Sequence, residues 1–183
     1  IESSEMNRWF KFQEVWAYRD LFYLLVWRDI KTRYAQSVLG IGWAIIQPLF
    51  SMVVFTVVFG NMAKISSDGV PYAIFSFAAL VPWTYFSGAL TRTGGSLLTA
   101  RGMITKVYFP RLVVPLVAVT GKLMDFGIAL LILFGLMLYF GFAPTVQVLL
   151  LPPVILMMVL TVAGVGMWLT ALALQYRDIT YSL

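Results

Sequence analysis

Four long apolar stretches alternate with short polar segments along the chain. This pattern predicts membrane-spanning helices at about 41–60, 71–90, 114–140 and 152–174. Each stretch is close to the length of about 20 residues that a helix needs to cross a bilayer. The connections at 61–71 and 141–147 are short turns. The pattern therefore predicts an all-α integral membrane protein in which residues 1–183 form a single transmembrane domain.

Residues 8–36 follow a different pattern, because their longest uncharged apolar run, Leu21–Trp27, is too short to cross a membrane. Trp9, Phe12 and Trp16 recur at helical spacing, and charged residues fill much of the rest. This pattern is typical of an amphipathic helix that lies flat in the membrane interface. A helix packed on protein would show the same pattern, and both readings stay open.

The segment 92–111 between the second and third spans carries basic residues and no acid: Arg92, Arg101, Lys106 and Arg111. A short loop this basic stays on the cytoplasmic side of a membrane. Gly94 and Gly95 are expected to break the chain there, and a short helix is expected over 96–108 before Pro110. The loop is either a solvated turn that fixes topology or a docking element for a cytoplasmic partner.

Composition and charge support this arrangement. The chain is 61% hydrophobic and 11% charged, whereas soluble domains carry about 25% charged residues. Of the 13 Lys and Arg residues, only Lys64 falls on the expected outer side, which predicts a cytoplasmic N-terminus. The net charge of +5 is confined to a few loops and indicates topology rather than nucleic-acid binding.

Two spans contain features that are unusual in a purely apolar helix. Gln47 and Pro48 interrupt the first, which fits either a tolerated kink or a helix that lines a cavity. In the third, Lys122 and Asp125 are three residues apart and are expected to pair as an intramembrane charge pair. A charge inside a span suggests a function, although Lys122 can also reach the cytoplasmic boundary.

Trp83, Tyr85 and Phe86 in the second span lie deeper than an interfacial aromatic belt. They are expected to face lipid, a neighbouring helix or a passage that conducts sugars.

The fourth span carries a patch of small residues, Ala163, Gly164, Gly166 and Thr170. Another helix is expected to approach closely at this patch.

Catalytic chemistry is absent from the sequence. There is no Cys and no His, which excludes thiol catalysis, an imidazole base and a His-based metal site. There is no P-loop that would bind ATP and no pair of carboxylates at catalytic spacing. We therefore predict that this chain is not an enzyme by itself and holds no metal or cofactor.

The ordered set of motifs resembles the permease subunit of type-2 ABC transporters that export bacterial polysaccharides such as O-antigen, capsule and teichoic acid. The matching segments are residues 27–48, residues 72–86, VYFPR at 107–111, Asp125, and YRD at 176–178. The resemblance covers nearly the whole chain.

The resemblance implies an interface helix within 8–36 and a coupling helix within 95–108 that sits on a separate ATPase subunit. The implied coupling residues are Arg101, Gly102, Met103, Ile104 and Lys106. The partner subunit would bind ATP and Mg, and a second copy of the chain would complete a homodimer around the sugar channel. The candidate substrate path is Tyr34, Trp43, Trp83, Tyr85 and Phe86.

The implied location is the bacterial cytoplasmic (inner) membrane, as a multi-pass protein. The family has six spans, so the two C-terminal spans are expected to be missing here, and Ile1 in place of Met also indicates a fragment. The predicted function is the transmembrane subunit of an ATP-driven exporter of a lipid-linked or long-chain polysaccharide. The alternatives are a type-2 ABC permease for drugs or lipids, and a membrane factor in glycan assembly. The sequence does not identify the glycan or its chain length.

Overall fold

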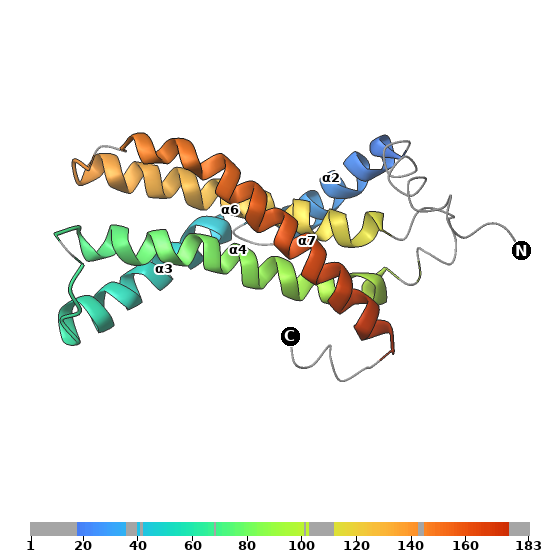
Figure 1. The fold of residues 1–183 in the computed structure, drawn as a ribbon, viewed down its shortest axis with the longest axis horizontal. Helices are drawn as coiled ribbons and strands as arrows, with labels where there is room; N and C mark the ends of the chain where they lie inside the picture. The colour runs from blue at the N-terminus through green and yellow to red at the C-terminus, as the bar shows by residue number, and fades with distance from the viewer. Residues whose placement is uncertain are drawn as a thin grey trace, which may run out of the picture. The chain divides into compact units, whose positions relative to one another are not determined.

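The computed structural model describes residues 18–35, 40, 42–67, 69–100, 102, 112–142 and 145–175. Its elements are α2 (Arg19–Ala35), α3 (Gly42–Phe55), the π-helical segment η1 (Thr56–Met62), α4 (Tyr72–Thr99), α6 (Val113–Tyr139), the 3₁₀ segment η2 (Val146–Leu150) and α7 (Leu151–Gln175) (Figure 1). None of the described residues lies in a strand.

Within the described residues, four helical segments are long and apolar enough to cross a membrane: Gly42–Met62, Tyr72–Thr99, Val113–Tyr139 and Val146–Gln175. These segments confirm the predicted all-α class and the predicted order of four spans. Helix α2 is not among them, in agreement with its short apolar run. The third span agrees with its predicted bounds to within a residue at each end.

The predicted break at Gly94 and Gly95 is wrong, because α4 continues through both glycines to Thr99. A glycine inside a helix costs about 1 kcal/mol relative to alanine, and the neighbouring packing offsets this cost. Thr93 and Ser96 are buried, and their hydroxyls donate hydrogen bonds to backbone oxygens within α4. The second span is therefore longer than predicted, and no separate helix begins at Ser96.

The first span also continues through its interruption, because Pro48 lies inside α3. Proline has no backbone N–H, so the carbonyl of Ala44, one turn earlier, loses its usual partner. The helix then widens into η1, where backbone bonds reach one residue further along the chain, as in the bond from Ala63 N–H to the Val58 oxygen at 2.9 Å. The sequence pattern gave no indication of this π-helical turn.

The chain folds as two compact units, and each long helix except α3 contributes to both. The first unit consists of residues 1–32, 89–121 and 159–183. Its hydrophobic cluster joins Leu25 of α2 to Val113 and Val114 at the start of α6, with five partly buried side chains around them: Leu21, Phe22, Leu97, Ala100 and Val117.

Helix α2 has two different apolar faces. Leu21, Phe22 and Leu25 pack on protein in the first unit. Tyr23, Leu24 and Trp27 are exposed by 68%, 60% and 57%. Helix α2 therefore packs on protein through one face, and a second apolar face stays available for lipid. The packed face supports the reading of a helix packed on protein. That this helix lies in the membrane interface stays a prediction, and residues 8–17 of the predicted interface helix lie outside the described residues.

The second unit consists of residues 33–88 and 122–158. One stripe of α4 is buried there, at Ile74, Phe77, Val81 and Tyr85. The rings of Tyr85 and Phe126 of α6 lie 5.2 Å apart, which joins these two helices. Helix α3 has no buried residue, and most of its large apolar side chains are exposed, from Trp43 to Phe55.

Candidate functional site

Asp125 of α6 is the centre of a polar cluster in the second unit. Its Oδ2 accepts hydrogen bonds from Arg33 Nη1 at 2.9 Å and from Lys122 Nζ at 3.0 Å. The hydroxyl of Tyr34 donates to Oδ1. The three charged side chains are only 20–25% exposed. The cluster therefore links the end of α2 to α6 through two ion pairs and a phenol.

The cluster holds two cations and one carboxylate, so its formal charge is +1 when all three groups are ionised. Removing charged groups from water costs free energy. This cost is offset only where the ions form well-aligned hydrogen bonds. Here three donors from two helices satisfy a single carboxylate. The expected contact between Lys122 and Asp125 is present, and its function stays a prediction.

Arg33 and Tyr34 were not predicted as partners of Asp125, because they lie more than 90 positions away in the sequence. Burial is the main reason that the pKa of Tyr34 rises to about 12, and the hydrogen bond to Asp125 adds to the effect. Near neutral pH the phenol therefore keeps its proton and acts as a donor. Tyr34 was predicted to lie on the substrate path, and the structure places its hydroxyl on Asp125.

A cavity of about 280 Å³ lies next to this cluster, within the second unit. Lys122 and Asp125 line it together with Tyr85, and α3 contributes Pro48 and Ala44. Its other polar lining residues are Gln47, Ser51, Thr84 and Ser87. Of the two readings of Pro48, the structure supports the helix that lines a cavity, since the carbonyl freed by proline belongs to Ala44 in the same wall.

The aromatic residues of the predicted substrate path do not gather in one place. Tyr85 lies on the cavity wall and is 3% exposed, whereas Trp83 is 64% exposed and Phe86 is half-buried. Residues two apart on a helix point in nearly opposite directions, so Trp83 and Tyr85 cannot line one passage from the same side of α4. Trp43 of α3 is 52% exposed and does not line the cavity.

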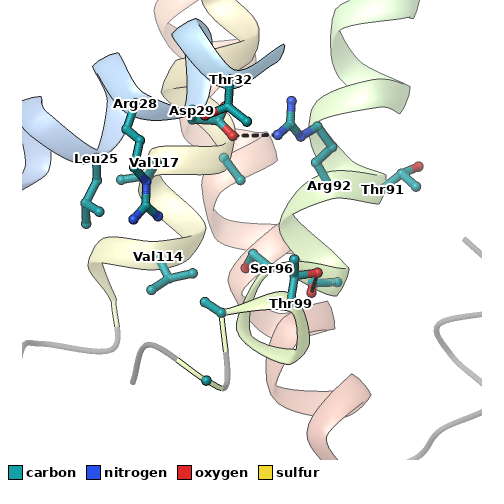
Figure 2. Close-up of a pocket in the computed structure, with 14 residues that line it drawn as sticks. Leu25, Arg28, Asp29, Thr32, Thr91, Arg92, Ser96, Thr99, Val114 and Val117 are labelled. Carbon is teal, nitrogen blue, oxygen red and sulfur yellow. Dashed lines mark hydrogen bonds and ion pairs between the residues drawn. The ribbon is translucent and has the colours of Figure 1, made fainter. Parts of the chain in front are cut away.

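A larger cleft of about 920 Å³ lies in the first unit, between α2, the end of α4 and the start of α6 (Figure 2). Its polar lining residues are Arg28, Asp29, Thr32, Thr91, Arg92, Ser96 and Thr99. Leu25, Ala100, Val114, Val117 and Ala118 supply apolar surface, and Gly95 and Gly102 complete the lining. The cleft thus combines two guanidinium groups with an aliphatic wall.

One ion pair bridges this cleft. Arg92 Nη2 of α4 donates to Asp29 Oδ1 of α2 at 2.7 Å, and Figure 2 shows the contact. Arg92 was predicted only as a topological charge, and its partner was not predicted. Of the five predicted coupling residues, Gly102 lies at the cleft. The other four, Arg101, Met103, Ile104 and Lys106, lie outside the described residues.

The comparison with protein families decides what kind of membrane protein contains these two sites. The model of the ABC-2 type transporter family matches residues 20–181. The chain belongs to this family. An ABC-2 membrane protein is a transport component, in agreement with the four candidate spans and with the resemblance found in the sequence.

Comparison with curated relatives shows which transport proteins the chain is similar to. The chain is 30% identical over 169 residues to the O-antigen export system permease protein of Myxococcus xanthus, an alignment that covers 92% of this chain and 64% of that protein. It is 27% identical to the protein of the same name from Klebsiella pneumoniae, over 87% of this chain and 61% of the relative. The polysialic acid transport protein of Escherichia coli is 26% identical over 42% of this chain and 30% of its own length. The chain thus spans under two thirds of the length of each relative.

Proposed function

We propose that the chain is the membrane subunit of an ATP-driven exporter that moves a lipid-linked or long-chain polysaccharide across the bacterial cytoplasmic membrane. The observation that carries this proposal is the similarity to an O-antigen export permease over 92% of the chain. The polar cavity in the second unit gives additional support, because polar side chains line it among apolar spans. A drug or lipid permease would also fit the family, but the named relatives favour a glycan.

A separate ATPase subunit would bind ATP and Mg, and a second copy of the chain would complete the passage for the glycan. The N-terminus and the segment 92–111 would face the cytoplasm, where the ATPase subunit acts, because basic loops stay on that side. The fold offers a physical route by which a movement of α2 would reach the membrane spans. Helix α2 is tied to α4 by the ion pair of Asp29 and Arg92, and to α6 by the bonds of Arg33 and Tyr34 to Asp125. A displacement of α2 would therefore act on two spans.

The export role predicts a specific result when the gene is deleted in the cells that make this protein. Surface glycan should be lost, while completed lipid-linked glycan should accumulate inside the cell, because synthesis does not depend on this subunit. The measurement is glycan staining of intact and of permeabilised cells. A complete absence of lipid-linked glycan would favour the assembly factor, and an unchanged surface with altered drug sensitivity would favour the drug permease.

The proposed coupling segment predicts a contrast between two variants. Burying an apolar side chain is worth about 1.5–3 kcal/mol, whereas an exposed ion pair is worth at most about 1 kcal/mol. Ile104→Asp should therefore release the ATPase subunit or uncouple export, and Arg101→Ala should do less. The measurements are co-purification of the ATPase subunit and glycan export. If Ile104→Asp keeps a wild-type complex and wild-type export, the segment is only a charged turn that fixes topology.

A further inference from the structure

The polar cavity of the second unit lies along the membrane spans rather than at their ends. Lys122, which lines it, is nine positions after Val113, the first residue of α6, and therefore about 14 Å along this helix. Hydrocarbon offers no hydrogen-bond partner, so polar groups at this depth need protein, water or a ligand beside them. A cavity with this lining suits a polar occupant rather than a lipid chain.

The positive charge beside this cavity exceeds the negative charge. Asp125 Oδ2 accepts hydrogen bonds from both Arg33 and Lys122, so one carboxylate serves two cations. Of these two cations, Lys122 lines the cavity and Arg33 does not. A methyl group at Gly88 of α4 would lie 3.3 Å from Lys122 Cε, so the lysine extends across α4 where glycine leaves room. An ammonium group has three donors, and Asp125 uses one of them. The other donors and the excess charge favour an anionic group in the cavity.

Hydroxyl groups of the lining are arranged as hydrogen-bond acceptors. Ser51 and Thr84 each donate to a backbone oxygen of their own helix at 3.1 Å. Because their protons are used in this way, their oxygens are left to accept. The carbonyl of Ala44, which loses its usual donor to Pro48, is a further acceptor in the same wall. Several acceptors in one wall favour a ligand that carries several hydroxyl donors.

Resting on the proposed export of a polysaccharide, we propose that this cavity binds one acidic sugar unit of the exported glycan, with its carboxylate at Lys122 and its hydroxyl groups at Ser51 and Thr84. A small free anion would use Lys122 and leave most of the acceptors unused. A neutral sugar would use the acceptors and leave the excess charge uncompensated, whereas an acidic sugar meets both. The volume of about 280 Å³ lies just below the range of sites for drug-sized ligands, about 300–1,000 Å³, so the cavity has room for one sugar ring rather than several.

The test compares two soluble probes that differ in one group, because methyl glucuronide carries a carboxylate where methyl glucoside carries a hydroxymethyl group. Binding to the purified protein in detergent is measured by titration with saturation-transfer NMR. Wild type should bind the glucuronide about ten-fold more tightly, the factor expected for one hydrogen bond between charged groups. Lys122→Met should remove this preference. Lys122→Arg should keep most of it, because the charge is preserved.

Lys64→Met is the matched control, since Lys64 belongs to the same unit, is exposed and does not line the cavity. It should keep the preference of wild type, and thermal unfolding of all three variants checks that the fold is intact. Equal binding of the two probes by wild type, an unchanged preference in Lys122→Met, or an equal loss in Lys64→Met would overturn the proposal. So would displacement of the glucuronide by an equal concentration of inorganic phosphate, which indicates a free-ion site.

The binding measurement and the gene deletion described above test different claims. Loss of surface glycan on deletion, without binding of the glucuronide, overturns the acidic-sugar site and leaves the export role in place. An unchanged surface on deletion, together with glucuronide binding that depends on Lys122, overturns the export role and leaves a site for acidic sugars in the cavity.

Discussion

Asp125→Asn is expected to destabilise the protein by on the order of 3 kcal/mol, because it leaves two cations without their shared carboxylate. Arg33 and Lys122 both lie within 3.0 Å of Asp125 Oδ2, and their side chains are at most 25% exposed. The amide of asparagine has nearly the same shape, so the loss reports charge rather than volume. The measurement is thermal or denaturant unfolding of the purified protein in detergent, together with glycan export.

Lys122→Met is the matched control for this prediction. It removes one cation and leaves the neutral pair of Arg33 and Asp125, so it should cost less than Asp125→Asn, which takes the carboxylate away from both cations. The double variant Lys122→Met with Asp125→Asn leaves one cation without the Asp125 carboxylate instead of two, and it should be more stable than Asp125→Asn alone. If Lys122→Met abolishes export while the protein stays stable, Lys122 has a role in transport beyond its ion pair. If Asp125→Asn is as stable as wild type, the electrostatic account of the cluster is wrong.

Gly166→Ala is expected to destabilise the first unit by about 1–3 kcal/mol, the usual cost of overpacking. A methyl group at Gly166 of α7 would lie 2.6 Å from Thr93 Cγ2 and 2.9 Å from Thr93 Cβ. Thr93 is fully buried, so it has little room to move. One turn later, the hydroxyl of Thr170 lies 2.6 Å from the Thr93 carbonyl oxygen. Any shift that relieves the clash would also stretch this hydrogen bond.

Gly164→Ala makes the same change two residues earlier, where a methyl group would meet nothing within 4 Å. Alanine is favoured over glycine in a helix by about 1 kcal/mol, so this variant should be neutral or stabilised. The opposite signs of the two effects can be measured in parallel by unfolding in detergent. Thr93→Ser removes the nearest methyl group and should partly restore Gly166→Ala. Equal effects at both glycines would contradict the close contact between α4 and α7.

The predicted patch of small residues on α7 shows what sequence can and cannot decide. The composition of Ala163, Gly164, Gly166 and Thr170 indicated that a helix could approach closely. Ala163, Gly166 and Thr170 are indeed buried, whereas Gly164 is exposed. The contact partner is Thr93, which lies 77 positions away from Thr170. A pattern along one helix contains no information about which helix packs on it.

The sequence by itself determined the all-α class, the four spans and their order, because hydrocarbon admits only long apolar helices whose backbone groups bond internally. It also indicated the family through short motifs in a fixed order. The predicted break at Gly94 and Gly95 was wrong because helix propensity differs by only about 1 kcal/mol between glycine and alanine. Burial of the neighbouring Thr93 and Ser96 outweighs that difference.

Only the tertiary structure decided the partners of the polar residues. The sequence placed Asp125 inside a span and Arg92 at the end of one, but the donors Arg33 and Tyr34 and the acceptor Asp29 come from α2, far away along the chain. Two charges three or four residues apart on one helix can be paired by counting, as Lys122 and Asp125 were. Pairs between helices depend on how the helices pack, because packing sets the distance between side chains that are remote in sequence. The same packing determines where the cavity and the cleft form and which charged side chains line them.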